Sequence, residues 1–297
     1  MKKIYGVIPA NLTPFTPEGE VDEESLRELI TFYLKKGVHG LHPCGSLGSG
    51  PLMTVKMRKK VAEIVIDEVE GKVPVIVHCG AADTYTTIEL SKHAKEHGAD
   101  AISVVTPYYY GARLDKTAII GHYKKISEAV DTPIFVYNFP DLSGFNITPE
   151  YLSELAKIPR VVGIKDSSGN FTQLSEYINI LGKEFLVLTG SDALILPGYI
   201  AGCKGVISAV GVVFPELVVN LWKACVDNDY SKAKKLHAKV LAARKALRGQ
   251  PYITTYYEAL KILGHDFGTS KPPLRCITNE EREKLRSNLR TTGLLSQ

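Results

Sequence analysis

The sequence predicts an α/β protein, a (β/α)8 or TIM barrel that is followed by a C-terminal helical extension. Short runs rich in Val and Ile alternate with longer stretches of helical periodicity, from the first residues to about Val226. Each run is too short for a helix and nearly continuous in hydrophobicity, as are the strands of a buried parallel sheet. Eight such runs follow one another along the chain: Ile4–Ala10, His39–Cys44, Val73–Cys79, Ala101–Thr106, Pro133–Asn138, Val161–Lys165, Phe185–Thr189 and Lys204–Ala209.

Eight strands that alternate with helices can close into a barrel or form an open, doubly wound sheet. The number eight matches the barrel. The connection after Ile4–Ala10 also lacks the glycine-rich loop with which doubly wound proteins bind dinucleotides. A chain of 297 residues is within the size range of a single α/β barrel. We therefore predict a closed barrel.

Helical periodicity fills the stretches between the runs, and turn residues mark several of the boundaries. Asp22 is a candidate N-cap for the first helix, which ends before Gly37. The third helix is bounded in the same way by Asp83 and Gly98. The predicted helices include Asp22–Lys36, Thr54–Val69, Thr84–His97, Asp115–Val130 and Thr148–Lys157.

After Val226 the alternation stops and the chain becomes helical. Tyr230–Arg248 is the first of three predicted helices, and Tyr252–Leu263 and Asn279–Leu289 are the others. We therefore divide the chain into a catalytic barrel, residues 1–226, and a helical extension, residues 227–297, that packs on the barrel or on a neighbouring subunit. In the first of these helices, helical spacing predicts one apolar stripe, made of Leu236, Val240, Leu241 and Leu247.

The composition is that of an ordinary globular protein. The net charge is only +4 and the basic residues are scattered, so we expect no nucleic-acid partner. No apolar run approaches membrane-spanning length, and the first residues do not form a signal-peptide core, so we expect no membrane association. The five cysteines are odd in number and irregularly spaced, which is typical of reduced thiols in the cytoplasm: Cys44, Cys79, Cys203, Cys225 and Cys276.

Lys165 is the first candidate for chemistry, because the active site of such a barrel lies at the carboxyl ends of its strands. It ends an otherwise apolar run, Val161–Ile164. Apolar walls make the charged form of an amine costly, lower its pKa and leave free amine that can attack a ketone. The alternative is a lysine that extends from the strand end into solvent. Tyr137, at the end of the preceding run, favours the catalytic interpretation.

Tyr137 and two loops each admit a functional and a structural interpretation. A networked tyrosine can shuttle protons, and a tyrosine can equally cap the core of a barrel. The glycine-rich segment Gly45–Gly50 can present backbone N–H groups to an anion or serve as a flexible connection. The aromatic segment Thr106–Gly111 can line a pocket, form a subunit interface, or do both.

A metal site is the disfavoured interpretation of four His and Cys residues near two neighbouring strand ends. They are not accompanied by HExxH, HxH or paired CxxC motifs, and barrel interiors accept neutral His and Cys. We therefore predict no metal at this cluster, which consists of His42, Cys44, His78 and Cys79.

Taken together, these segments resemble the family of dihydrodipicolinate synthase and N-acetylneuraminate lyase, which also includes 2-keto-3-deoxygluconate aldolases. The resemblance runs from Thr13-Pro14-Phe15 through the helical extension. Its specific marks are five motifs in the expected order: Gly45-Ser46-x-Gly48, Thr106-Pro107-Tyr108-Tyr109, Tyr137-Asn138-Phe139-Pro140, Gly163-Ile164-Lys165-Asp166 and Gly205-Val206-Ile207-Ser208.

The resemblance implies a reaction and its catalytic residues. Lys165 would form an imine with pyruvate or another 2-keto acid, so that no separate cofactor is needed. Tyr137 would be the acid and base, relayed through Ser46 and through Tyr109 of a neighbouring subunit. The resemblance further implies a homotetramer built as a dimer of dimers, acting on a small keto acid and an aldehyde.

It also implies the substrate contacts. The Ser46 hydroxyl and the backbone N–H groups of Ser46 and Leu47 would hold the substrate carboxylate, and the Ile207 carbonyl would line the pyruvate site. We expect further contacts at neighbouring strand ends, from Ser167, Gly190, Asp192 and Ser208.

Departures from the family pattern indicate which branch of the family this sequence resembles most. Leu142 stands where dihydrodipicolinate synthases usually carry an arginine that pairs with a carboxylate. Asp192-Ala193 keeps half of the Asp-Glu pair found in sialic acid lyases. Leu47 replaces a more usual threonine, and the segment after Gly48 lacks the usual glutamate, as in archaeal-type ketodeoxygluconate aldolases.

These features favour an aldolase that reversibly cleaves a 2-keto-3-deoxy sugar acid, of the 2-keto-3-deoxygluconate or N-acetylneuraminate type, to pyruvate and an aldehyde. The main alternative is a dihydrodipicolinate synthase, which condenses pyruvate with aspartate semialdehyde. Two further hypotheses are a non-catalytic barrel that binds a keto acid and a metal-dependent barrel hydrolase.

Overall fold

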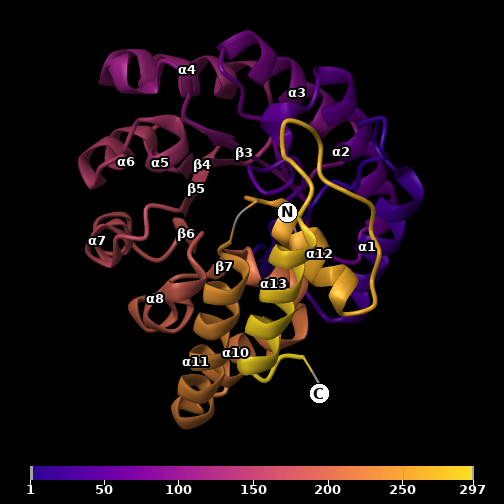
Figure 1. Ribbon diagram of the computed structural model, residues 1–297. Coiled ribbons are helices and arrows are strands. Elements are labelled where there is room, and N and C mark those ends of the chain that lie inside the picture. Colours follow the sequence, from indigo (N-terminus) through magenta and orange to yellow (C-terminus); the bar gives the residue numbers. More distant parts are fainter. Residues whose placement is uncertain (1–2, 250, 296–297) are drawn as a thin grey trace.

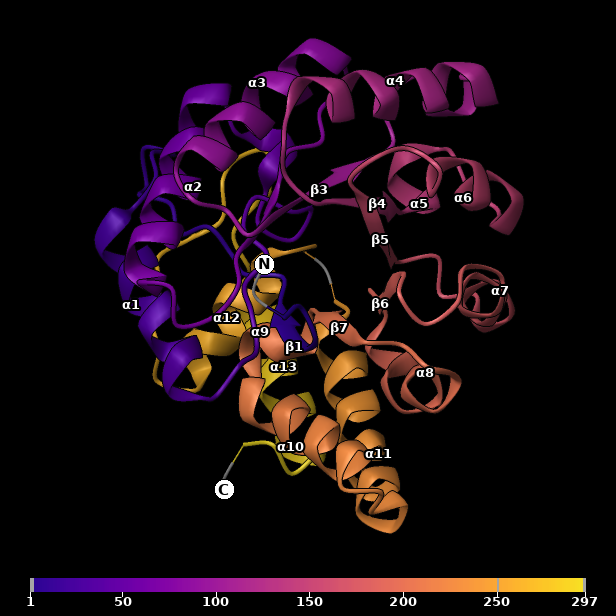
Figure 2. The same cartoon turned by 180° about the vertical axis from the view of Figure 1, so that it is seen from behind.

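The computed structural model describes residues 3–249 and 251–295, and its centre is a ring of parallel strands. Seven strands pair in the order β1-β7-β6-β5-β4-β3-β2, and helices cover the outside of the ring (Figures 1 and 2). This confirms the predicted (β/α)8 barrel with added C-terminal helices. The strands are β1 Gly6–Pro9, β2 Ile76–His78, β3 Ala101–Val105, β4 Ile134–Asn138, β5 Val161–Asp166, β6 Leu186–Thr189 and β7 Gly205–Ser208.

The prediction of a regular strand over His39–Cys44 is wrong, although this segment does occupy the eighth position. Its only bridge is between Leu41 and Val75, but its backbone bonds to both neighbouring strands. The His39 N–H donates to the Val7 carbonyl at 2.8 Å, and the Ile76 N–H donates to the Leu41 carbonyl at 2.9 Å. Pro43 has no N–H to donate, and Cys44 turns into the left-handed region. The ladder is therefore interrupted while the barrel stays closed.

Helices begin where the sequence predicts caps. The Asp22 carboxylate accepts from the Ser25 N–H at 3.1 Å, and the Asp83 carboxylate accepts from the Thr86 N–H at 2.9 Å. The barrel helices are α1 Glu23–Lys35, α2 Val55–Val69, α3 Thr84–Glu96, α4 Lys116–Ala129, α5 Pro140–Ser143, α6 Pro149–Leu155, α7 Phe171–Leu181, α8 Ile195–Ala201, α9 Val210–Val213 and α10 Pro215–Val226, with 3-10 turns η1 Gly50–Leu52, η2 Gly111–Arg113 and η3 Asp192–Leu194.

The C-terminal helices α11 Tyr230–Leu247, α12 Thr254–Ile262 and α13 Asn279–Thr291 pack against the barrel. The Tyr257 hydroxyl of α12 donates to the Thr13 carbonyl at 2.6 Å, and Leu260 is fully buried in the same core as the strands. The predicted stripe of α11 holds for Val240 and Leu247 but not for Leu241, which is 41% exposed. The boundary at residue 226 stays a prediction.

Within the described residues, no helix combines the length and the apolar character that a bilayer crossing requires.

Leu260→Ala tests whether the extension contributes to the barrel's core. Deleting a fully buried leucine side chain costs about 2–5 kcal/mol, and truncating an exposed one costs about 0.5 kcal/mol or less. In urea unfolding we expect Leu260→Ala to lower the free energy of unfolding of the whole barrel, whereas the exposed control Leu241→Ala leaves it unchanged. A barrel transition that is unaffected by Leu260→Ala would contradict a shared core.

Candidate active site

Lys165 and Tyr137 lie side by side at the carboxyl ends of β5 and β4. The strand register pairs the two residues directly, and the Lys165 Nζ lies 3.9 Å from the centroid of the Tyr137 ring. Gly163 lets β5 pack closely against both neighbouring strands, because a Cβ atom there would meet the Phe135 ring at 2.5 Å and the Leu186 carbonyl at 2.4 Å. The sequence thus brings an amine and a phenol together through sheet register alone.

The Lys165 amine is held in an environment that disfavours its charge. The residue is 3% exposed, and burial lowers the pKa of Lys165 to about 7. In the described part of the chain, no carboxylate lies within ion-pair distance of its Nζ. A large share of the amine is therefore neutral and nucleophilic near neutral pH.

Tyr137 is 2% exposed, and burial raises the pKa of its phenol. Hydrogen bonds from the Ser46 and Ser167 side chains oppose this rise. The Ser46 Oγ lies 3.4 Å from the phenol oxygen, which connects Tyr137 to the glycine-rich loop. The phenol therefore keeps its proton at neutral pH and is linked to two hydroxyl groups through which a proton can move.

The loop that carries Ser46 is folded so tightly that its glycines are required. A Cβ atom at Gly50 would lie 1.9 Å from the Cys44 carbonyl, and one at Gly48 would lie 2.7 Å from the Asn11 carbonyl. Among the residues that the structure describes, no acceptor is found for the backbone N–H groups of Ser46 and Leu47. Both residues line the cavity, so these N–H groups can receive an anion.

The cavity at this end of the barrel has a volume of about 550 Å³. Eight of the predicted site residues line it: Ser46, Leu47, Tyr137, Lys165, Ser167, Gly190, Asp192 and Ile207. Ser208 and Tyr109 do not line it.

Ser208 and Asp192 are engaged with each other. The buried Ser208 hydroxyl donates to the Asp192 carboxylate, and the backbone N–H groups of Ala209 and Val210 donate to the other carboxylate oxygen at 3.2 and 3.1 Å. Burial raises the pKa of Asp192, and these bonds oppose the rise. Asp192 therefore fixes the start of α9. The sequence predicts a substrate contact at Asp192 and does not reveal this structural role.

Tyr109 lies on the outside of the single chain. Its side chain is 86% exposed, it has a φ of 77°, and its ring meets that of Tyr110 edge-on at 4.9 Å. Gly111 fixes the loop against α5, because a Cβ atom there would lie 1.7 Å from the Ser143 carbonyl. The role of Tyr109 across a subunit interface stays a prediction.

The histidines near the site each have a partner within the protein. The His42 Nε2 lies 2.8 Å from the Ser103 Oγ, and the His78 Nδ1 accepts from the Gly80 N–H at 3.0 Å. Burial holds the pKa of both rings well below the usual value, so both are neutral. They pack around the Tyr137 ring, with ring centroids 6.2 and 5.5 Å away.

Sequence reasoning missed the part of the cavity wall that comes from the helical extension. Arg244 and Arg248, one turn apart at the end of α11, and the following Tyr252 and Tyr256 all line the cavity. Their signal in the sequence is the spacing of two arginines by four residues, which places them on one helix face. Periodicity does not indicate which part of the barrel that face meets.

Fold and site together describe a (β/α)8 barrel with a buried lysine in the cavity at the carboxyl ends of its strands. The model of the dihydrodipicolinate synthetase family matches residues 3–292. The chain belongs to this family, and it is a carbon–carbon lyase of the class I aldolase type.

Relatives and solved structures match this chain over nearly its whole length. The chain is 38% identical to an uncharacterised DapA-like lyase of Halobacterium salinarum, over 98% of this chain and 95% of the relative. It is 37% identical to the 4-hydroxy-tetrahydrodipicolinate synthase of Methanopyrus kandleri, over 99% and 98%. It superposes on the pyruvate complex of YagE, an Escherichia coli prophage protein of the family, with a TM-score of 0.94, 32% identity and coverage of 98% and 99%.

The buried amine predicts a stability that depends on pH. An unfolded lysine titrates near 10.5 and the folded Lys165 near 7, so between these values the folded state binds fewer protons. Stability is therefore lost as the pH falls from about 10.5 to about 7, by up to about 5 kcal/mol.

Lys165→Met removes this cost, so we expect a higher free energy of unfolding in urea than for the natural protein. The gain should be large near pH 7 and shrink as the pH rises. The exposed control Lys124→Met should show neither effect. Equal stability of Lys165→Met and the natural protein at pH 7 would argue against a desolvated amine.

Proposed function

We propose that this protein is a Schiff-base aldolase that reversibly cleaves a 2-keto-3-deoxy sugar acid to pyruvate and an aldehyde. The observation that carries the proposal is the buried amine of Lys165, whose pKa is lowered to about 7 beside the phenol of Tyr137. The amine itself serves as the electron sink once it is joined to substrate, so the reaction needs no separate cofactor.

Lys165 carries the substrate through the reaction as an imine. The neutral Lys165 amine adds to the C2 ketone, and the carbinolamine loses water with a proton from the Tyr137 phenol, which leaves a protonated imine and a phenolate. The C3–C4 bond breaks with its electron pair moving toward the iminium, which gives an enamine, while the phenolate takes the proton of the C4 hydroxyl so that the aldehyde can leave. The phenol then gives this proton to C3, and addition of water releases pyruvate and the free amine and returns the proton to Tyr137.

The glycine-rich loop fits the carboxylate next to the ketone. Ser46 and Leu47 both line the cavity, and the Ser46 hydroxyl lies 3.4 Å from that of Tyr137. An anion held there would orient the ketone for attack by Lys165. Leu47 contributes a backbone N–H, so the lack of a side-chain hydroxyl at this position does not remove the donor.

Leu142 supports a sugar acid as the substrate. It stands at the position of the arginine that clamps a carboxylate in dihydrodipicolinate synthases, and its side chain is 49% exposed and does not line the cavity. The cavity is instead bordered by hydroxyl groups such as those of Ser167, Ser168 and Ser191, which suit a polyol chain.

A 4-hydroxy-tetrahydrodipicolinate synthase is the second candidate, because several relatives that are 33–39% identical carry that name. The two candidates share the imine with pyruvate and differ in the aldehyde. We also propose that the protein acts in the cytoplasm as a tetramer, a dimer of dimers, in which the exposed Tyr109 reaches the site of a neighbouring subunit.

Trapping with borohydride tests the proposal. Incubation with pyruvate and borohydride should attach a reduced pyruvyl group to the peptide that contains Lys165. The rate of trapping should rise with pH through about 7, because only the neutral amine attacks. Tyr137→Phe should still be trapped, while its turnover falls by about 100- to 10,000-fold through loss of the proton relay.

The aldehyde partner is distinguished by steady-state rates with pyruvate plus either glyceraldehyde or aspartate semialdehyde. Preference for aspartate semialdehyde would favour the second candidate. Absence of any adduct on Lys165 would refute both.

A further inference from the structure

Two arginines of the helical extension face the catalytic cavity. Arg244 and Arg248 lie one turn apart at the end of α11, and both line the cavity that contains Lys165. Arg244 is half-buried and Arg248 is exposed. Like charges at this spacing on a helix repel each other, so the pair is unfavourable in the absence of a negative partner.

The protein supplies little compensation for these charges. Burial, followed by repulsion from Arg248, lowers the pKa of Arg244. Within residues 3–249 and 251–295, neither guanidinium forms an ion pair with a carboxylate. Asp192 attracts Arg244, but its two oxygens already accept bonds from Ser208 and from backbone N–H groups. A partly desolvated cation without a dedicated partner is costly, and an anion within the cavity would remove that cost.

Two tyrosines stand beside these arginines. Tyr252 and Tyr256 follow on the same wall, and burial raises the pKa of both phenols, so they are neutral donors. Asp141 of α5 also lines the cavity and is the other acidic group on its wall besides Asp192. The α11 side of the cavity thus gathers guanidinium and phenol donors, which is the donor set that binds carboxylate or phosphate groups.

We propose that Arg244 and Arg248 form a second anion subsite, which selects aldehydes that carry a carboxylate or a phosphate at the end remote from the reacting carbonyl. This rests on the proposed aldolase function and specifies its substrate class. The loop at Ser46 holds the carboxylate of the pyruvyl part, Lys165 holds the reacting carbon, and the α11 wall holds the second anion. Arg244, the more buried of the two, makes the larger contribution.

The test compares matched aldehydes in the synthetic direction with pyruvate. The panel contains glyceraldehyde as the neutral member, glyceraldehyde 3-phosphate as the phosphate and aspartate semialdehyde as the carboxylate. In Arg244→Gln we expect kcat/KM to fall about 10- to 100-fold for the preferred anionic aldehyde and to stay unchanged for glyceraldehyde. Arg244→Lys should recover part of the loss, and the exposed neighbour variant Lys245→Gln should leave every rate unchanged.

The outcomes separate this proposal from the aldolase function. Pyruvate trapping on Lys165 reports the aldolase function alone and should be intact in Arg244→Gln. Equal losses for neutral and anionic aldehydes would show a merely structural role and overturn the subsite. The subsite would also be overturned if the natural enzyme is trapped by pyruvate yet shows no preference for either anionic aldehyde. The anionic aldehyde whose kcat/KM falls more in Arg244→Gln identifies whether the subsite binds phosphate or carboxylate.

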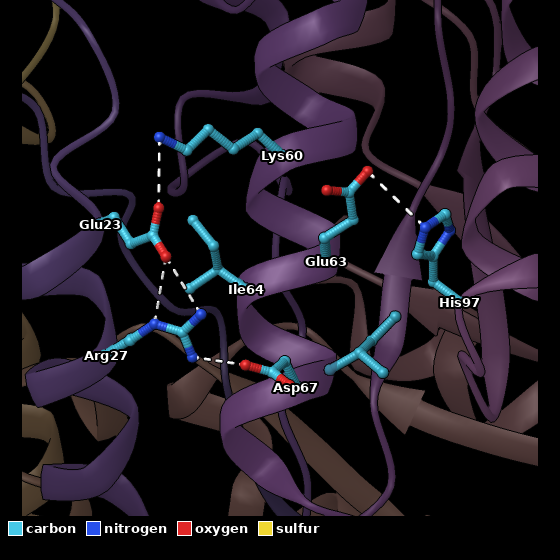
Figure 3. Close-up of a pocket in the computed structure, with 8 residues that line it drawn as sticks. Glu23, Arg27, Lys60, Glu63, Ile64, Asp67 and His97 are labelled. Atoms are coloured by element: carbon cyan, nitrogen blue, oxygen red, sulfur yellow. Dashed lines mark hydrogen bonds and ion pairs between the residues drawn. The ribbon is translucent and has the colours of Figure 1, made fainter.

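A separate observation concerns the outer wall of the barrel, where Glu63 of α2 faces His93 of α3 and His97, the residue that directly follows α3. The His93 Nε2 lies 2.7 Å from a Glu63 carboxylate oxygen, and the His97 Nε2 lies 3.8 Å from the same oxygen. One donor atom from each residue lies within 4.8 Å of the others. Figure 3 shows Glu63 and His97 pointing toward each other. Both residues line a surface cavity of about 420 Å³.

The geometry already prepares His97 to act as a ligand. Its Nδ1 lies 2.9 Å from the His93 carbonyl oxygen, and only a protonated Nδ1 can donate to a carbonyl, so the Nε2 keeps its lone pair. His93 and His97 are four residues apart near the end of a helix, the spacing that puts two imidazoles on one face for a metal ion. In a tetrahedral zinc site, donor atoms lie about 3.3 Å apart, which modest side-chain rotation reaches.

We infer that Glu63, His93 and His97 bind a borderline transition-metal ion such as Zn²⁺ and thereby link α2 to α3, away from the catalytic cavity. Solvent completes the coordination, because Glu63 and His97 are exposed. The chemistry of two imidazoles and one carboxylate favours Zn²⁺, Co²⁺ or Ni²⁺ over Mg²⁺ or Ca²⁺.

Titration of the full chain with Zn²⁺ by calorimetry, and with Co²⁺ by visible absorption, tests the site. We expect micromolar Zn²⁺ binding that raises the melting temperature, and loss of both effects in His93→Gln and His97→Gln. Glu96→Gln, an exposed charge change on the same helix, is the control and should bind normally. Metal binding that survives both histidine variants, or no binding by the natural chain, would overturn the site.

Discussion

Desolvation of one amine is the constraint on which this site depends. Lys165 lies near the carboxyl end of β5, whose side chains are almost all buried, and no carboxylate of the described residues forms an ion pair with it. The same burial that makes the amine a nucleophile makes it a cost to folding, because the charged form is favoured in the unfolded chain. A barrel can bear this cost, since its strand ends are fixed by a large apolar core rather than by the site itself.

Register then places the phenol of Tyr137 beside this amine. Tyr137 is paired directly with Lys165 in adjacent parallel strands, and the absence of a side chain at Gly163 leaves room for the ring of Phe135. The Tyr137 ring is in turn surrounded by the neutral imidazoles of His42 and His78. Both imidazoles are neutral, so they add no charge beside the phenol or the amine.

The features that could be predicted from the sequence are those set by short-range pattern and by sheet register. Lys165, Tyr137 and the glycine-rich loop of Ser46 follow from apolar runs and from what stands at their ends. The irregular segment His39–Cys44 was predicted as a strand because hydrophobicity does not reveal that Pro43 breaks the ladder. Arg244 was not predicted as a site residue, because the docking of α11 depends on tertiary packing that periodicity does not encode.

The cavity wall is made partly by the strand ends of the barrel and partly by the helical extension, and the two parts differ in what they can contact. Strand ends converge on one axis, so they concentrate reactive groups within a few ångströms of Lys165, but they cannot reach a distant part of a long substrate. In the proposed subsite α11 meets that part, and the α11 residues that line the cavity take no part in the register of β4 and β5. The imine-forming lysine and the proposed anion subsite therefore lie on separate elements, so that a change in one leaves the other in place.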